Sequence, residues 1–117
     1  MKPFVPLLFI LFTLNSCSTF KSGLTIPANN TFLLGELNDE NYNAEIINPS
    51  DFTVLLKTID KESGVVREIF GLAPKEKISL FIRRDETVHF ENENGVDVRI
   101  DVILSKEVEG MRYIENK

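Results

Sequence analysis

The chain carries few side chains that could perform chemistry. His89 is the only histidine and Cys17 the only cysteine among 117 residues. A nucleophile–base pair or a zinc site needs several such groups brought together. We therefore predict that the protein is not an enzyme, and we expect no catalytic residue, no metal site and no cofactor. A lone strand histidine such as His89 is expected to be structural or incidental.

Carboxylates offer the remaining candidates. Asp97 and Asp101 share one face of a predicted strand, and paired carboxylates can act as general acid and base. Arg99 lies between them, which instead indicates an exposed ladder of ion pairs. The oxygen-rich segments 91–97 and 38–41 could supply calcium ligands, but neither has the helix–loop–helix ligand spacing. Asn and Asp are also the usual residues of turns, which is the reading we favour.

The N-terminal segment has the pattern of an export signal. Lys2 precedes an almost unbroken apolar run over residues 4–14. This run is shorter than the roughly 20 residues of a membrane-spanning helix and suits a signal peptide. Leu14-Asn15-Ser16-Cys17 follows it. These four residues resemble the lipobox of bacterial lipoproteins, although a smaller residue is commoner at Asn15.

The resemblance covers residues 1–17 and implies a cellular location. It implies that the signal peptide, residues 1–16, is removed and that the Cys17 thiol receives a diacylglycerol. The small and polar residues that follow predict that residues 17–30 form the lipidated cysteine and a tether. Ser18 in place of an aspartate implies, by analogy with Gram-negative sorting, the outer membrane, and we expect the periplasmic face. The alternative is an ordinary secretory signal followed by a chance cysteine.

Composition bounds the possible partners. The formal net charge is −5 and the pI is near 4.9, which disfavours electrostatic binding to nucleic acid. Hydrophobic residues make up 43% of the chain, enough for one packed domain. The expected partners are the membrane, through the lipid, and another envelope protein.

Residues 31–117 read as one β domain, because apolar residues recur with a period of two. The clearest strand spans 96–105, and Asn94-Gly95 predicts a hairpin between it and a strand at 87–91. Further strands are expected at 31–34, 42–46, 52–59, 65–70, 77–82 and 111–114.

Seven or eight short strands predict an all-β fold: a single small antiparallel β-sandwich, or a small barrel. The pattern is similar to an immunoglobulin-like sandwich in its Asn48-Pro49-Ser50 corner, its Asn-Gly turn and its long late strand. It lacks the Cys…Trp…Cys signature, since the chain has no tryptophan.

Four apolar residues fall opposite the predicted core positions: Leu55, Ile59, Phe81 and Ile103, with Ile47 a possible fifth. If their strands are neighbours, they form an apolar patch of the kind that marks partner sites. They could instead be covered, or a bulge could shift the strand register. We expect a non-catalytic interaction or assembly module for an envelope protein. The alternative is a small-ligand, glycan or ion-binding domain, with a cleft lined by aromatic residues such as Tyr42, Phe52, Phe70 and Tyr113.

Overall fold

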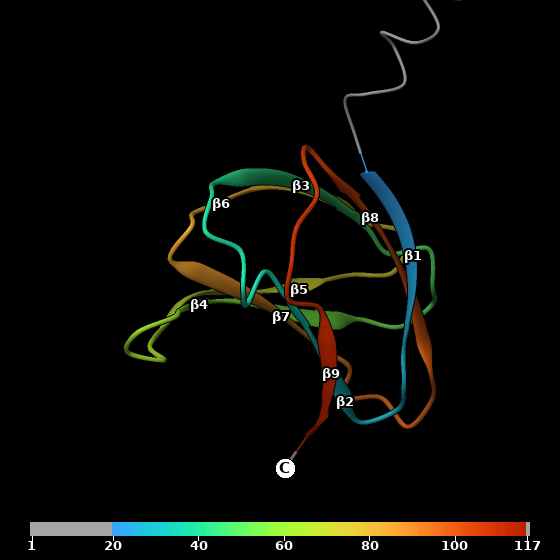
Figure 1. Cartoon of the computed structure of the whole chain (residues 1–117). Helices are drawn as coiled ribbons and strands as arrows, with labels where there is room; N and C mark the ends of the chain where they lie inside the picture. The colour runs from blue at the N-terminus through green and yellow to red at the C-terminus, as the bar shows by residue number, and fades with distance from the viewer. Residues whose placement is uncertain (1–19, 117) are drawn as a thin grey trace, which may run out of the picture.

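The computed structural model describes residues 20–116, which form nine antiparallel strands in two facing sheets (Figure 1). The strands are β1 (Phe20–Ile26), β2 (Asn30–Leu34), β3 (Tyr42–Ile47), β4 (Val54–Asp60), β5 (Val66–Leu72), β6 (Lys77–Ile82), β7 (Glu86–Glu91), β8 (Val98–Leu104) and β9 (Arg112–Glu115). The predicted all-β antiparallel sandwich is confirmed. Residues 20–116 contain no helix that is long and apolar enough to cross a membrane.

The strand order defines a jelly roll. One sheet has the order β1-β8-β3-β6, and the other has β5-β4-β7-β2-β9. The first eight strands make two four-stranded sheets, and β9 adds to the edge at β2. This order differs from that of an immunoglobulin-like sandwich, whose Greek-key connections pair its strands in another pattern. Of the nine described strands, only β4 and β5 are consecutive in sequence and also paired.

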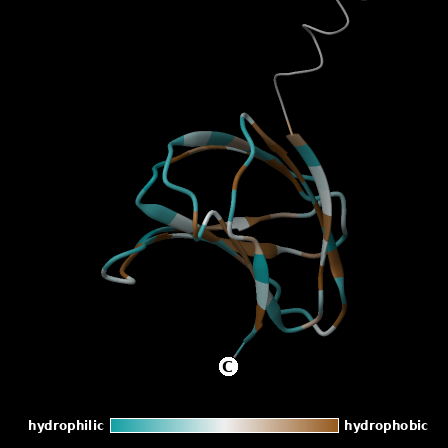
Figure 2. Ribbon diagram, viewed as in Figure 1, coloured by the Kyte–Doolittle hydropathy of each residue, from teal (hydrophilic) through white to brown (hydrophobic). Residues whose placement is uncertain are grey.

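The core lies between the sheets and follows the predicted alternation. In β8, Val98, Ile100, Val102 and Leu104 are buried, whereas Arg99 is exposed. The strands in Figure 2 are banded accordingly, because successive side chains point to opposite faces. Across the core the rings of Phe32 and Phe90 meet edge to face at 5.6 Å.

The domain begins earlier than the sequence predicts. Residues 20–26 form β1, which pairs along its whole length with β8, from Phe20 opposite Leu104 to Ile26 opposite Val98. The prediction of a tether over 17–30 is therefore wrong for residues 20–26, and the sandwich starts at residue 20 rather than 31. Ile26 is fully buried, which ties this strand to the core. The signal peptide and Cys17 lie outside the described residues.

The predicted Asn-Gly hairpin is also wrong. β7 and β8 belong to different sheets, so the connection from Asn92 to Asp97 crosses from one sheet to the other. The buried Asn92 side chain holds this crossing: its amide nitrogen donates to the carbonyl oxygens of Ile26, Pro27 and Val96. Local turn propensity is thus overridden by a buried polar anchor.

Candidate binding surfaces

The structure separates the four residues of the predicted interface. Leu55 and Ile59 lie on the outer face of β4, and Phe81 and Ile103 lie on the outer face of the opposite sheet. Phe81 and Ile103 are themselves parted by β3, which places Glu45 beside Ile103. The predicted single patch is therefore not formed, because the period of two assigns a residue to a face but not to a sheet.

A smaller apolar surface surrounds Leu55 and Ile59. In the pairing of β4 with β5, Ile59 lies opposite Val66. Lys57, which lies between Leu55 and Ile59 on the same face of β4, is opposite Ile69. Val66 is 39% and Ile69 57% exposed. We call Leu55, Ile59, Val66 and Ile69 the β4–β5 strip. Among residues 20–116, β5 is the last strand of its sheet, so the strip borders an edge that no other described strand pairs with.

The β5 half of this strip was not predicted from the sequence. The side chains of Phe70 and Leu72 both point toward the core. Alternation along the strand places Ile69 on the outer face, so its position could have been predicted from the sequence. Val66 could not be placed in the same way, because the β4–β5 register shifts between Thr58 and Ile59. Such a bulge changes which face the following side chains point to, and the pattern of apolar residues in the sequence does not reveal it.

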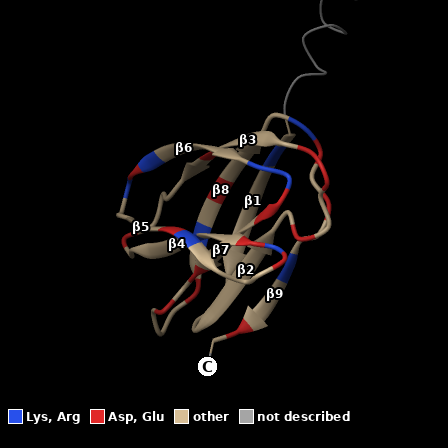
Figure 3. Cartoon of the chain, turned by 90° about the vertical axis from the view of Figure 1, so that its left-hand side faces the viewer, with Lys and Arg blue, Asp and Glu red and all other residues tan. Residues whose placement is uncertain are grey.

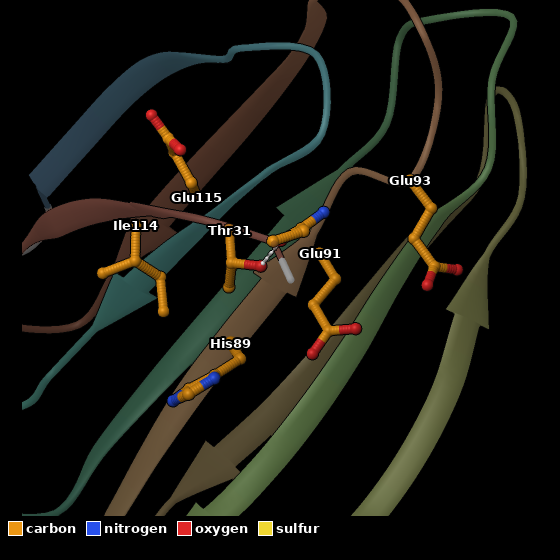
Figure 4. A pocket seen from close by; sticks show the side chains of 7 residues that line it. Thr31, His89, Glu91, Glu93, Ile114 and Glu115 are labelled. Carbon is orange, nitrogen blue, oxygen red and sulfur yellow. Dashed lines mark hydrogen bonds between the residues drawn. The ribbon is translucent and has the colours of Figure 1, made fainter.

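A shallow hollow of about 280 Å³ lies on the outer face of the same sheet (Figure 4). His89 and Glu91 project into it from β7, and Thr31 from β2. The remaining lining residues are Glu93, Ile114, Glu115 and Asn116. The surface is thus rich in carboxylates and open to solvent.

Burial is the main influence on the ionisation of His89, and it favours the neutral form of the imidazole. Partial burial lowers the pKa of His89, and the nearby charge of Lys57 lowers it further, against the opposing effect of Glu91. Lys57 and Glu91 pair with each other at 2.9 Å (Nζ to Oε2). Within the described chain, no three histidine, cysteine or carboxylate side chains are grouped to hold a metal ion.

The carboxylates of the predicted pair have separate partners. Asp101 accepts hydrogen bonds from Arg99 two residues away on β8, at 3.1 and 3.2 Å. Asp97 accepts one from the backbone N–H of Ala28 at 3.0 Å. The oxygen-rich turns likewise use their side chains locally, as where Asn94 donates to Asn92 Oδ1 at 2.9 Å. Asp97 and the turn side chains thus stabilise the connections, whereas Asp101 and Arg99 pair along β8.

Arg67 is the centre of an ion cluster that the sequence did not suggest. Its guanidinium contacts Asp85 and the buried Glu86 at 3.2 and 3.0 Å, and it also pairs with Asp60. Arg67 lowers the pKa of Asp85; hydrogen bonds from Ser63, followed by Arg67, lower that of Asp60. One guanidinium thus bridges three carboxylates, and the cluster fastens the β4–β5 hairpin to the turn before β7.

The interior of the sandwich is occupied by side chains. The buried cluster runs from Ile26 and Phe32 to Ile100 and Leu104. A cavity between β1 and β2, lined by Leu24 and Phe32 among others, measures only about 10 Å³, which is no more than a single water needs. Tyr42 and Phe70 belong to this packing, so they do not line a cleft with the exposed Phe52 and Tyr113.

Comparison with known proteins identifies a fold class. No protein-family model matches the chain, and no curated protein does. Among solved structures, it is similar to Peruvianin-I, a cysteine peptidase from Thevetia peruviana latex, with a TM-score of 0.58 and 8% identity over 86% of this chain and 58% of that one. It is also similar to RmlC from Streptococcus suis, solved with dTDP-D-xylose, with a TM-score of 0.54 and 15% identity over 84% of this chain and 48% of that one.

A subunit of Bacillus endospore appendages, described as disulfide-linked pili, aligns over 86% of this chain and 90% of its own length, with 10% identity and a TM-score of 0.46. The chain spans about half the length of the first two structures. At these identities the likeness shows the fold alone. The protein is thus a small jelly-roll β-sandwich with an added edge strand.

Proposed function

We propose that this protein is a lipid-anchored, non-catalytic interaction module of the cell envelope. Cys17 attaches it to the outer membrane on the periplasmic face, and the β4–β5 strip contacts another envelope protein. The lipobox residues Leu14 to Cys17 support the anchor, and one acyl-bearing cysteine with two or three chains gives stable attachment.

The observation that carries the partner proposal is the position of the strip. Apolar side chains on an outer sheet face reach the unpaired edge of β5, where Ile69 is 57% exposed. An exposed apolar surface next to free backbone donors and acceptors suits a protein that adds a strand or packs on the face. Lys57 interrupts the strip, but its charged end is turned to Glu91 and its aliphatic stem can join the contact.

Two matched variants test this surface. Ile69→Glu places a charge in the strip, whereas Phe81→Glu places one at an equally exposed apolar position (59%) on the opposite sheet. Membranes of cells expressing each protein are crosslinked mildly, and the co-purifying proteins are identified. We expect one envelope protein in stoichiometric yield that is lost with Ile69→Glu and kept with Phe81→Glu. A monomer without a partner, or loss only with Phe81→Glu, would contradict the proposal.

The hollow around His89 supports a second candidate, a small-ligand, glycan or ion-binding domain. Glu91, Glu93 and Glu115 line it, so a bound group would carry hydroxyls or positive charge. A thermal-shift screen with glycans, amines and metal ions tests this candidate. A ligand that raises the melting temperature of the wild type, but not of Glu91→Gln, would favour it over the interaction module.

A further inference from the structure

Very little chain separates Cys17 from the first strand. Residues 18 and 19 alone lie between Cys17 and Phe20, where β1 begins. Three Cα–Cα steps span at most about 11 Å, whatever conformation the chain adopts. The start of β1 is therefore held close to any lipid that Cys17 carries.

This distance can be compared with the thickness of a membrane surface. A diacylglycerol on Cys17 would place its sulfur near the boundary between acyl chains and headgroups. The headgroup layer on each side of a bilayer is roughly 5–8 Å thick, from the difference between total and hydrocarbon thickness. The start of β1 would thus lie in that layer or at its outer surface.

Two connections between strands lie at the same end of the sandwich as the start of β1. Phe20 pairs with Leu104, the last residue of β8, so segment 105–111 leaves beside it (Figure 1). The carbonyl oxygen of Gly110 accepts hydrogen bonds from the N–H groups of Gly35 and Glu36 at 3.1 and 3.3 Å. Segments 35–41 and 105–111 are therefore neighbours. We call them, with the first residues of β1, the anchored end.

The anchored end exposes large apolar side chains. Leu37 is 72%, Phe20 45% and Met111 41% exposed. These three side chains come from the three different segments of the anchored end, so their exposure is not the result of one irregular loop. Apolar side chains of this kind can enter the headgroup region of a membrane by several ångströms.

Charges at the same end restrict the type of lipid. Asp39, Glu40, Glu107 and Glu109 line a hollow of about 380 Å³ beside Leu37. Figure 3 shows acidic residues in the connections near the start of β1, with basic residues among them. Glu40 pairs with Lys106, and the carboxylates of Asp39, Glu107 and Glu109 still leave this surface acidic. An acidic surface repels anionic lipid, so it suits zwitterionic headgroups.

We propose that the anchored end of the sandwich lies against the membrane, with Phe20, Leu37 and Met111 among zwitterionic phospholipid headgroups. The inference rests on the acylation of Cys17 in the proposed function. It adds that the domain is oriented by its own surface and does not hang freely from its lipid.

The absence of tryptophan from the sequence allows a direct test with single-tryptophan variants. Leu37→Trp and Met111→Trp report on the anchored end. Phe52→Trp is the control, because Phe52 is 42% exposed in the connection after β3, at the opposite end of the strands. Each full-length acylated protein is placed in phosphatidylcholine vesicles with either ordinary or brominated acyl chains, which quench nearby indole fluorescence.

We expect brominated lipid to reduce the fluorescence of Leu37→Trp and Met111→Trp and to leave Phe52→Trp unchanged. Phosphatidylglycerol in the vesicles should weaken the quenching. A flexible Gly/Ser insert of about twelve residues before Phe20 should also weaken it, because the domain can then move away. Equal fluorescence in both vesicle types at positions 37 and 111 would overturn the inference.

The mass of each preparation separates the two levels of the proposal. An acylated Cys17 without quenching at the anchored end removes the orientation and leaves the lipid anchor intact. An unmodified Cys17 removes both, since nothing then fixes the start of β1 at a membrane.

Discussion

At the scale of single residues, two buried asparagines hold the connections opposite the anchored end. Asn48 follows β3 and Asn92 follows β7, and neither side chain is accessible to solvent. Each oxygen accepts the backbone N–H two residues later, from Ser50 and Asn94, at 3.0 Å. Their amide nitrogens bond to backbone carbonyls of neighbouring strands. Sequence patterns mark both residues as turn formers, but only the fold shows why an amide is required.

Asn48→Asp tests this role. The Asn48 amide nitrogen donates to the carbonyl oxygens of Phe52, Leu72 and Ala73 at 2.7, 3.1 and 3.2 Å, and a carboxylate would face those oxygens instead. We expect the free energy of unfolding, measured by urea denaturation, to fall by about 2–4 kcal/mol. The control Asn43→Asp, at an exposed position, should change it by less than about 0.5 kcal/mol. Equal effects would contradict this role.

His89 provides a pH-dependent prediction. Burial lowers its pKa in the folded protein below the ordinary value of 6.5, so the unfolded chain binds the proton more readily. Stability contributed by the neutral side chain is present at high pH and is lost as the pH falls below the unfolded value. Between about pH 7 and 5, we expect His89→Gln to flatten the decline in unfolding free energy. Parallel curves for variant and wild type would show that His89 titrates alike in both states.

At the scale of elements, the sequence predicted strands better than it predicted their pairing. Eight of the nine described strands fall where apolar alternation places them, because this alternation directly reflects one buried face. Pairing in a jelly roll joins strands far apart in sequence, such as β1 with β8 and β3 with β6, and no local pattern encodes this. The candidate interface failed for the same reason, since Leu55 and Phe81 have correct phases but lie on opposite sheets.

β1 was not predicted because its alternation of apolar and polar residues is weak. Ser22 and Gly23 occupy its centre, and of its apolar residues only Ile26 is fully buried. The strand also follows directly on a lipobox, where a tether is common. Its membership of the sheet is visible only through its pairing with β8.

Adjacent substitutions in β1 distinguish a strand from a tether. Ile26→Asp would bury a carboxylate in the core, whereas Thr25→Asp places one on the exposed face opposite Arg99. We expect Ile26→Asp to cost more than about 3 kcal/mol of unfolding free energy and Thr25→Asp less than about 0.5 kcal/mol. Thermal and urea unfolding followed by circular dichroism measures both. Equally small effects would show that residues 20–26 do not belong to the folded domain.

At the scale of the whole molecule, the proposals form one arrangement. In this arrangement the anchored end faces the membrane, the strands lead away from it, and the outer faces of both sheets are directed sideways, roughly perpendicular to the bilayer plane. The β4–β5 strip would then be open to a neighbouring envelope protein at a fixed height. A rigid sandwich with a filled interior suits such a module, since its surfaces rather than an internal cavity make the contacts.

The state of Cys17 tests the central claim most directly. The protein is expressed from its full sequence in a Gram-negative cell, purified from membranes without a tag at its N-terminus, and measured by intact-mass and peptide mass spectrometry. The account predicts a mature chain that begins at Cys17 and carries a diacylglycerol on its sulfur. A chain that begins elsewhere, or one that begins at Cys17 with a free thiol, would contradict the account of a lipid-anchored module.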